Sequence, residues 1–71
     1  MQYHAVSSSS IAEVGYDQST STLGVRFQNG SEYQYFGVPE SEFEALRSAG
    51  SIGTYLNTRI KAAGYSYAKI S

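Results

Sequence analysis

The feature that most constrains the fold of this chain is Asn29-Gly30, which divides residues 22–39 into two runs of alternating apolar residues. An Asn-Gly pair between two such runs is the strongest short-range signal for a β-hairpin, because both residues tolerate the left-handed backbone of a tight turn. We therefore expect an antiparallel strand pair here. The register of that pair decides which side chains are buried, since a shift of one residue moves every side chain to the other face.

Two turn geometries compete for this hairpin. In a two-residue turn Val25 faces Gln34, and Tyr33 and Tyr35 lie on the outer face. A three-residue turn has Gly30 in the left-handed position. Its facing pairs are Phe27 with Ser31, Val25 with Tyr33, Leu23 with Tyr35, and Arg26 with Glu32. We favour this second register, because one face becomes uniformly apolar and the charge pair on the other adds roughly 0.2–1 kcal/mol. Tyr33 and Tyr35 are then expected in the core rather than on a stacking surface.

Before the hairpin, the sequence predicts a polar terminus and one strand. Residues 1–10 end in four serines, so we expect a solvated terminal segment with the single histidine, His4, at the surface. Residues 11–17 alternate in polarity and predict a strand with Ile11 and Val14 on opposite faces. Together with the hairpin, this strand makes a three-stranded antiparallel meander.

Two helices are expected after the hairpin. Pro39 suits the first helical position, and glutamates follow it where they favour the positive end of the helix dipole. Gly50 is expected to end this helix in the left-handed conformation. Ser51 then caps a second helix, which begins at Ile52, runs to about residue 63 and ends at Gly64.

Residues 65–70 alternate once more and predict a short last strand, with Tyr65, Tyr67 and Lys69 on one face. These side chains would form an aromatic and basic strip if exposed, and the strand would cap an edge of the sheet if not. The expected fold is therefore a single α+β domain over residues 1–71. Its order is β-β-β-α-α-β, an antiparallel meander with two helices packed on one face and a short C-terminal strand.

Composition excludes several classes of function. The formal net charge of -1 argues against a protein that coats duplex nucleic acid. The chain has no cysteine, one histidine and no paired carboxylates, so we expect no catalytic residue, metal or cofactor. A chain this short must gain its stability either from an aromatic core or from self-association. Seven tyrosines and three phenylalanines favour the aromatic core. No apolar segment approaches about 20 residues and no signal peptide is evident, so we expect a cytoplasmic protein without membrane contact.

The candidate binding residues gather around the start of the second helix. Gly53 lies just inside the cap at Ser51, where it would let another chain segment or an anion approach the backbone closely, and we favour packing against the meander. Tyr55 and Asn57 follow on the same helix, and a base could lie against Tyr55 or Tyr16. The cations that could contact phosphates are Arg26, Arg59, Lys61 and Lys69.

With these residues laid out, the sequence resembles the KTSC domain over about residues 6–67. The resemblance rests on Val6-x-Ser8-Ser9-x-Ile11, Gly15-Tyr16-Asp17, Leu23-x-Val25-x-Phe27-x-x-Gly30, Tyr33-x-Tyr35, Val38-Pro39 and Ser51-x-Gly53-x-Tyr55-x-Asn57-x-x-Ile60. This family is named for the C-terminus of some lysyl-tRNA synthetases and also occurs as free-standing proteins. Its biochemical role is undefined, and the synthetase context implies RNA binding.

Three hypotheses about function follow. The domain could bind single-stranded RNA through aromatic faces and a few cations. It could instead bind a small anionic nucleotide-like ligand at the start of the second helix. We favour this over a polymer, because the five lysines and arginines are offset by six acidic residues. The alternative is a structural or oligomerisation domain without a ligand, in which the chain forms a homo-oligomer.

Overall fold

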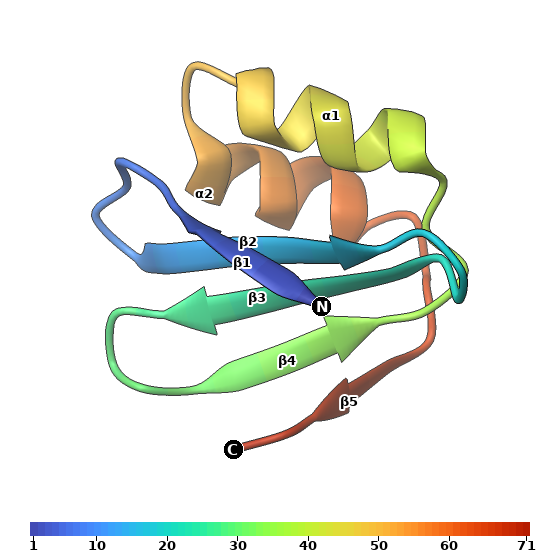
Figure 1. Cartoon of the computed structure of the whole chain (residues 1–71). Helices are drawn as coiled ribbons and strands as arrows, with labels where there is room; N and C mark the ends of the chain where they lie inside the picture. Colours follow the sequence, from blue (N-terminus) through green and yellow to red (C-terminus); the bar gives the residue numbers. More distant parts are fainter.

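The computed structural model describes all 71 residues, and its centre is an open five-stranded antiparallel sheet (Figure 1). The strands lie in the sheet in their sequence order: β1 (Gln2–Ala5), β2 (Ile11–Asp17), β3 (Thr22–Phe27), β4 (Glu32–Tyr35) and β5 (Tyr67–Lys69). The helical elements are α1 (Glu40–Ser48), α2 (Ile52–Tyr55) and the π-helical turn η1 (Leu56–Ile60), which continues α2. The predicted α+β fold, with two helices and a C-terminal strand, is confirmed. Neither helix has the length and apolar character needed to cross a membrane.

The hairpin adopts the three-residue turn. Gly30 has a φ of 91°, and the Phe27 N–H donates to the Ser31 carbonyl at 2.8 Å. The facing pairs of β3 and β4 include Leu23 with Tyr35, Val25 with Tyr33, and Arg26 with Glu32. The Arg26 Nε lies 3.3 Å from a Glu32 carboxylate oxygen. The register predicted from the uniformly apolar face is therefore confirmed.

The N-terminal segment contains a strand that the sequence did not indicate. Residues 1–10 were expected to be solvated, but β1 pairs with β2 along four residue pairs. The Tyr3 ring lies directly against Gly24, where a Cβ would collide with the Tyr3 hydroxyl. The guanidinium of Arg26 stacks 3.7 Å from the centre of this ring, and Tyr3 donates to Glu32 at 3.0 Å. Contacts with distant residues thus hold a segment whose own composition is polar.

The predicted orientation of Ile11 in β2 is wrong, because the strand contains a β-bulge. The pairing of β2 with β3 shifts between Ile11 and Glu13. This extra residue turns Ile11 toward the helices, so Ile11 and Val14 are both fully buried on the same face. Strict alternation had placed them on opposite faces.

The end of α1 also differs from the prediction. Pro39 precedes the first helical residue, and the helix ends at Ser48 because Ala49 is extended, with a ψ of 145°. Gly50 is not in the left-handed region. The chain therefore leaves α1 by an extended residue, and the glycine is not needed as a left-handed cap.

The second helix begins as predicted and ends differently. The Ser51 hydroxyl accepts a hydrogen bond from the Thr54 N–H at 3.3 Å, which confirms the cap. Its last turn is η1, in which the Lys61 N–H reaches back five residues to the Leu56 carbonyl at 2.9 Å. Gly64, with a φ of 80°, then turns the chain toward β5.

The helices cover only part of one sheet face. Figure 1 shows them over the β2 side of the sheet, away from β5. Val14 of β2 and Val25 of β3 are fully buried beneath them, whereas Tyr67 of β5 is 65% exposed. The buried core is Ile11, Val14, Leu23, Val25, Tyr35, Val38, Phe43, Leu46, Ile52, Leu56 and Ile60. The helices leave the other part of this face, over β4 and β5, uncovered.

Candidate functional site

A groove lined by aromatic side chains occupies the part of the sheet that the helices leave uncovered. It has a volume of about 560 Å³, within the range of about 300–1,000 Å³ that is common for small-molecule sites. Its lining is Phe27, Tyr33, Tyr35, Lys61, Gly64, Tyr65 and Tyr67. We call this the aromatic groove. The turn after η1 forms one side, β4 lies beneath it, and β5 forms the other side.

The aromatic side chains of the groove differ in their solvent exposure. Tyr35 is 4% exposed and belongs to the core, whereas the neighbouring Tyr67 is 65% exposed. Their ring centres are 5.8 Å apart with planes tilted by 37°, and Tyr67 is tilted by 45° to Tyr33 at 6.2 Å. Phe27 meets Tyr33 edge to face at 5.8 Å, so the half-buried Tyr33 is held in place. Tyr67 can therefore offer a ring face to a ligand.

Two lysines border these rings. Lys61 lines the groove on the helix side. Lys69 faces Tyr33 across the β4–β5 pair, and directly facing residues project to the same side of a sheet. No carboxylate lines the groove. The surroundings of the groove are thus locally positive, although the chain carries a formal net charge of -1.

A carboxylate on α1 holds one wall of the groove from behind. The Tyr65 phenol donates to the Glu42 Oε2 at 3.3 Å, and the Tyr55 phenol donates to Oε1 of the same residue. Desolvation, followed by the nearby negative charge of Glu42, raises the pKa of Tyr65. The hydrogen bond to Glu42 is the main cause of the raised pKa of Tyr55. Glu42 therefore joins α1 to both α2 and the segment before β5.

Removing this carboxylate tests the junction. We expect Glu42→Ala to lower the free energy of unfolding by about 1–2 kcal/mol, because two partly buried phenols lose a charged acceptor. Urea denaturation measures the change. The matched control is Glu44→Ala on the same helix, since Glu44 is exposed and its only ion pair is with Arg47 at 3.7 Å. Equal effects of the two substitutions would contradict the role of Glu42.

Three of the predicted site residues meet at a second concavity. Ser51, Gly53 and Asn57 line a hollow of about 370 Å³ together with the serine segment 7–10. We call this the polar hollow. A Cβ on Gly53 would lie 2.9 Å from the Ser10 hydroxyl, so the glycine permits the close approach of the serine segment. Another chain segment does approach Gly53, but it is the loop before β2 and not the meander strands that the sequence favoured.

The structure places the other predicted site residues elsewhere. Lys61 lines the aromatic groove, and Arg59 is exposed on η1. The Tyr55 phenol is occupied by Glu42, as described above. Arg26 lies on the sheet face opposite the helices, where it also pairs with Glu13 at 3.1 Å. The predicted residues therefore do not form one site.

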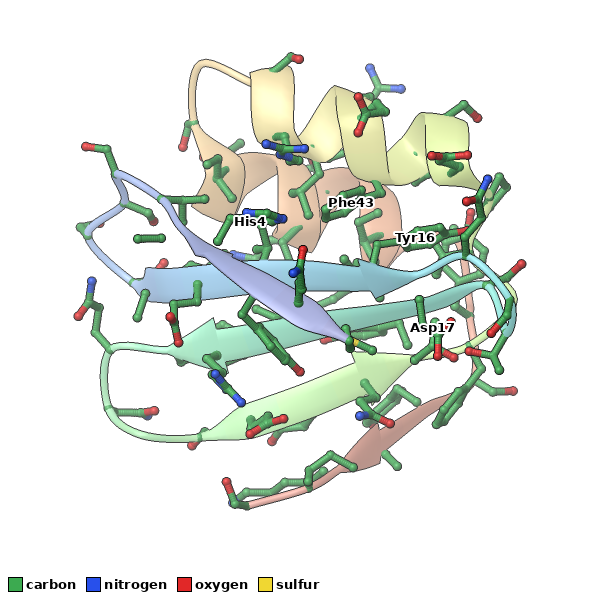
Figure 2. All side chains as sticks on the ribbon, in the orientation of Figure 1. His4, Tyr16, Asp17 and Phe43 are labelled. Carbon is green, nitrogen blue, oxygen red and sulfur yellow. The ribbon has the colours of Figure 1, made fainter.

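Tyr16 is also occupied by contacts within the fold. Its ring stacks on Phe43 of α1 with centres 5.1 Å apart, and Figure 2 shows the two side chains between the sheet and the helix. Its phenol donates to the Val38 carbonyl. Tyr16 thus fastens the start of α1 to β2, and its ring is not available to stack on a base.

The groove joins residues that the sequence did not connect. Alternation placed Tyr65, Tyr67 and Lys69 on one face of the last strand, but it did not show which strand lies beside them. The pairing of Tyr67 with Tyr35 in β4 brings them next to the hairpin tyrosines. The relevant signal in the sequence is the repeated Tyr-x-Tyr, at residues 33–35 and 65–67.

Comparison with known proteins gives consistent matches. The model of the KTSC domain family matches residues 7–67. The crystal structure of a KTSC domain protein from Yersinia pestis aligns with a TM-score of 0.90 and 38% identity, covering 99% of this chain and 97% of that chain. An uncharacterized protein of Stutzerimonas stutzeri is 37% identical over 70 residues, 99% of each chain. The lysine-tRNA ligase of Nostoc punctiforme is 45% identical over 51 residues, which are 72% of this chain and 9% of that protein.

Proposed function

This chain belongs to the KTSC domain family, and we propose that it is a non-enzymatic domain that binds a nucleotide-like ligand, free or within single-stranded RNA, in the aromatic groove. One observation carries the proposal: the part of the sheet that the helices leave open presents tyrosine rings between two lysines. Rings that stack on bases, combined with cations that contact phosphates, are the usual means of binding unpaired nucleotides.

The relatives support the RNA form of this ligand. Lysine-tRNA ligases of Nostoc punctiforme and Trichormus variabilis contain a segment similar to this chain, which spans 9% and 11% of their lengths. By their names, these enzymes act on a tRNA. A similar domain attached to such an enzyme is well placed to contact RNA.

The polar hollow supports the proposal less well. Its lining contains hydroxyl and amide side chains, but no aromatic ring and no charged side chain. The serine hydroxyls could hydrogen-bond a phosphate, but they supply neither stacking nor a counter-charge. The anion site expected at Ser51, Gly53 and Asn57 therefore ranks below the aromatic groove.

The proposal is tested by titrating the protein with uridine 5′-monophosphate and with a short oligouridine, followed by NMR. We expect dissociation constants in the micromolar range or weaker. The affinity for RNA should fall with salt by only about 0.7 log units per log unit of salt for each phosphate contacted. Tyr67→Ala should weaken binding about tenfold, within the range for losing one stacked base.

The matched control is Phe36→Ala. Phe36 follows directly after β4 and is 38% exposed, but its ring does not line the groove. We expect this variant to bind as the parent does. If neither probe binds, or if the two variants lose equal affinity, the nucleotide function is wrong. Native mass spectrometry of the same samples would then decide whether the chain is an oligomerisation domain.

A further inference from the structure

The helix-side wall of the aromatic groove carries an unpaired positive charge. Lys61 is the first residue after η1, and its backbone N–H is tied to the Leu56 carbonyl at 2.9 Å. Its side chain lines the groove and forms no ion pair within the chain. The helix end therefore places this ammonium group at the groove, and no carboxylate of the chain neutralises it.

The opposite side of the groove carries a second unpaired charge. Lys69 lies in β5, directly opposite Tyr33, and it also forms no ion pair within the chain. Because β5 is the edge of the sheet, no further strand covers this lysine. The Tyr33 ring thus lies between a lysine on the helix side and a lysine on the strand side.

The acidic groups on β4 and behind Tyr65 do not offset these two charges. Glu32 belongs to the opposite face of the sheet, where it pairs with Arg26. Glu42 accepts hydrogen bonds from two phenols behind the wall at Tyr65. Lys61 follows η1 and Lys69 lies in β5, so the two lysines come from elements on different sides of the groove and can each meet a separate phosphate.

Resting on the function proposed above, we propose that the aromatic groove recognises a nucleoside with a phosphate on each side of its sugar. An internal nucleotide of a single strand has this chemistry, and so does a nucleoside 3′,5′-bisphosphate. The base stacks on Tyr67 and Tyr33, one phosphate lies toward Lys61 and the other lies toward Lys69. A mononucleotide has one phosphate and can therefore contact only one of the two lysines in this arrangement.

The test compares uridine 5′-monophosphate with uridine 3′,5′-bisphosphate by calorimetric titration at two salt concentrations. We expect the bisphosphate to bind about threefold to fivefold more tightly, the range for one added solvent-exposed charge contact. One of the two substitutions, Lys61→Gln or Lys69→Gln, should remove that advantage, because it removes the partner of the phosphate that the monophosphate lacks, and the other should weaken both nucleotides about equally. Each substitution should also reduce the salt dependence by about one phosphate contact.

The matched control is Arg59→Gln, which removes a charge from an exposed residue of η1 that does not line the groove. We expect it to leave the preference for the bisphosphate unchanged. Equal binding of the two nucleotides, with the loss on Tyr67→Ala retained, would overturn this inference and leave the proposed function standing. A loss in Arg59→Gln as large as in the lysine variants would also overturn it. Failure of both nucleotides and of the oligouridine to bind would remove the proposed function itself.

Discussion

Replacing Tyr35 with alanine should lower the free energy of unfolding by about 3–5 kcal/mol, the range for truncating a buried aromatic residue. Tyr35 is 4% exposed and faces Leu23 across the hairpin, so the substitution leaves a cavity beneath the groove. In chains of about 70–80 residues or fewer, a single hydrophobic core rarely supplies more than about 3–5 kcal/mol of stability. Urea denaturation followed by circular dichroism should therefore show a large shift of the midpoint or an unfolded protein.

The control for this prediction is a substitution at Tyr67, which faces Tyr35 across the β4–β5 pair. Tyr67→Ala should change stability by about 1 kcal/mol or less, because this side chain is 65% exposed. It should nevertheless weaken nucleotide binding, as predicted above. An unchanged melting temperature in Tyr35→Ala would place that ring at the surface. Two equally destabilised variants would contradict the division of this sheet face into core and groove.

Replacing Gly15 with alanine has the second largest expected effect, a loss of about 2–3 kcal/mol. A Cβ at this position would lie 2.6 Å from the Gln2 backbone carbonyl oxygen. A backbone atom cannot move aside as the end of a flexible side chain can, so β1 must shift away from β2. Hydrogen exchange of the β1 amides measures this shift directly, and urea denaturation measures its cost.

Gly50→Ala is the matched glycine control. Nothing lies within 4 Å of a Cβ built on Gly50, and its φ is not in the left-handed region. We expect no loss, or a gain of up to about 1 kcal/mol, because alanine restricts the unfolded chain. A clear destabilisation would instead support the left-handed cap that the sequence suggested. Unchanged protection of β1 in Gly15→Ala would show that the strand does not depend on this glycine.

The hairpin shows how far local sequence determines this fold. Asn29-Gly30 specifies the turn, and only one register places Leu23, Val25 and Tyr35 on a common face. The cap at Ser51 is also local, since the hydroxyl and the Thr54 N–H are three residues apart. Such features follow from contacts between near neighbours, so the sequence by itself determined the meander, the start of the second helix and the family.

Tertiary structure decided the features that depend on distant residues. The strand β1 is held by contacts of Tyr3 with Gly24 and Arg26. These partners lie more than 20 residues away, so the sequence of residues 1–10 does not predict the strand. The register predicted both hairpin tyrosines in the core, but only Tyr35 is buried there, and Tyr33 is half-buried at its edge. The helices cover β2 and β3 on this face of the sheet, and the aromatic groove lies over β4 and β5 on the same face. Tertiary packing determines how much of a sheet a short helix covers. Here the helices do not extend over β5, so Tyr67 is exposed beside the buried Tyr35.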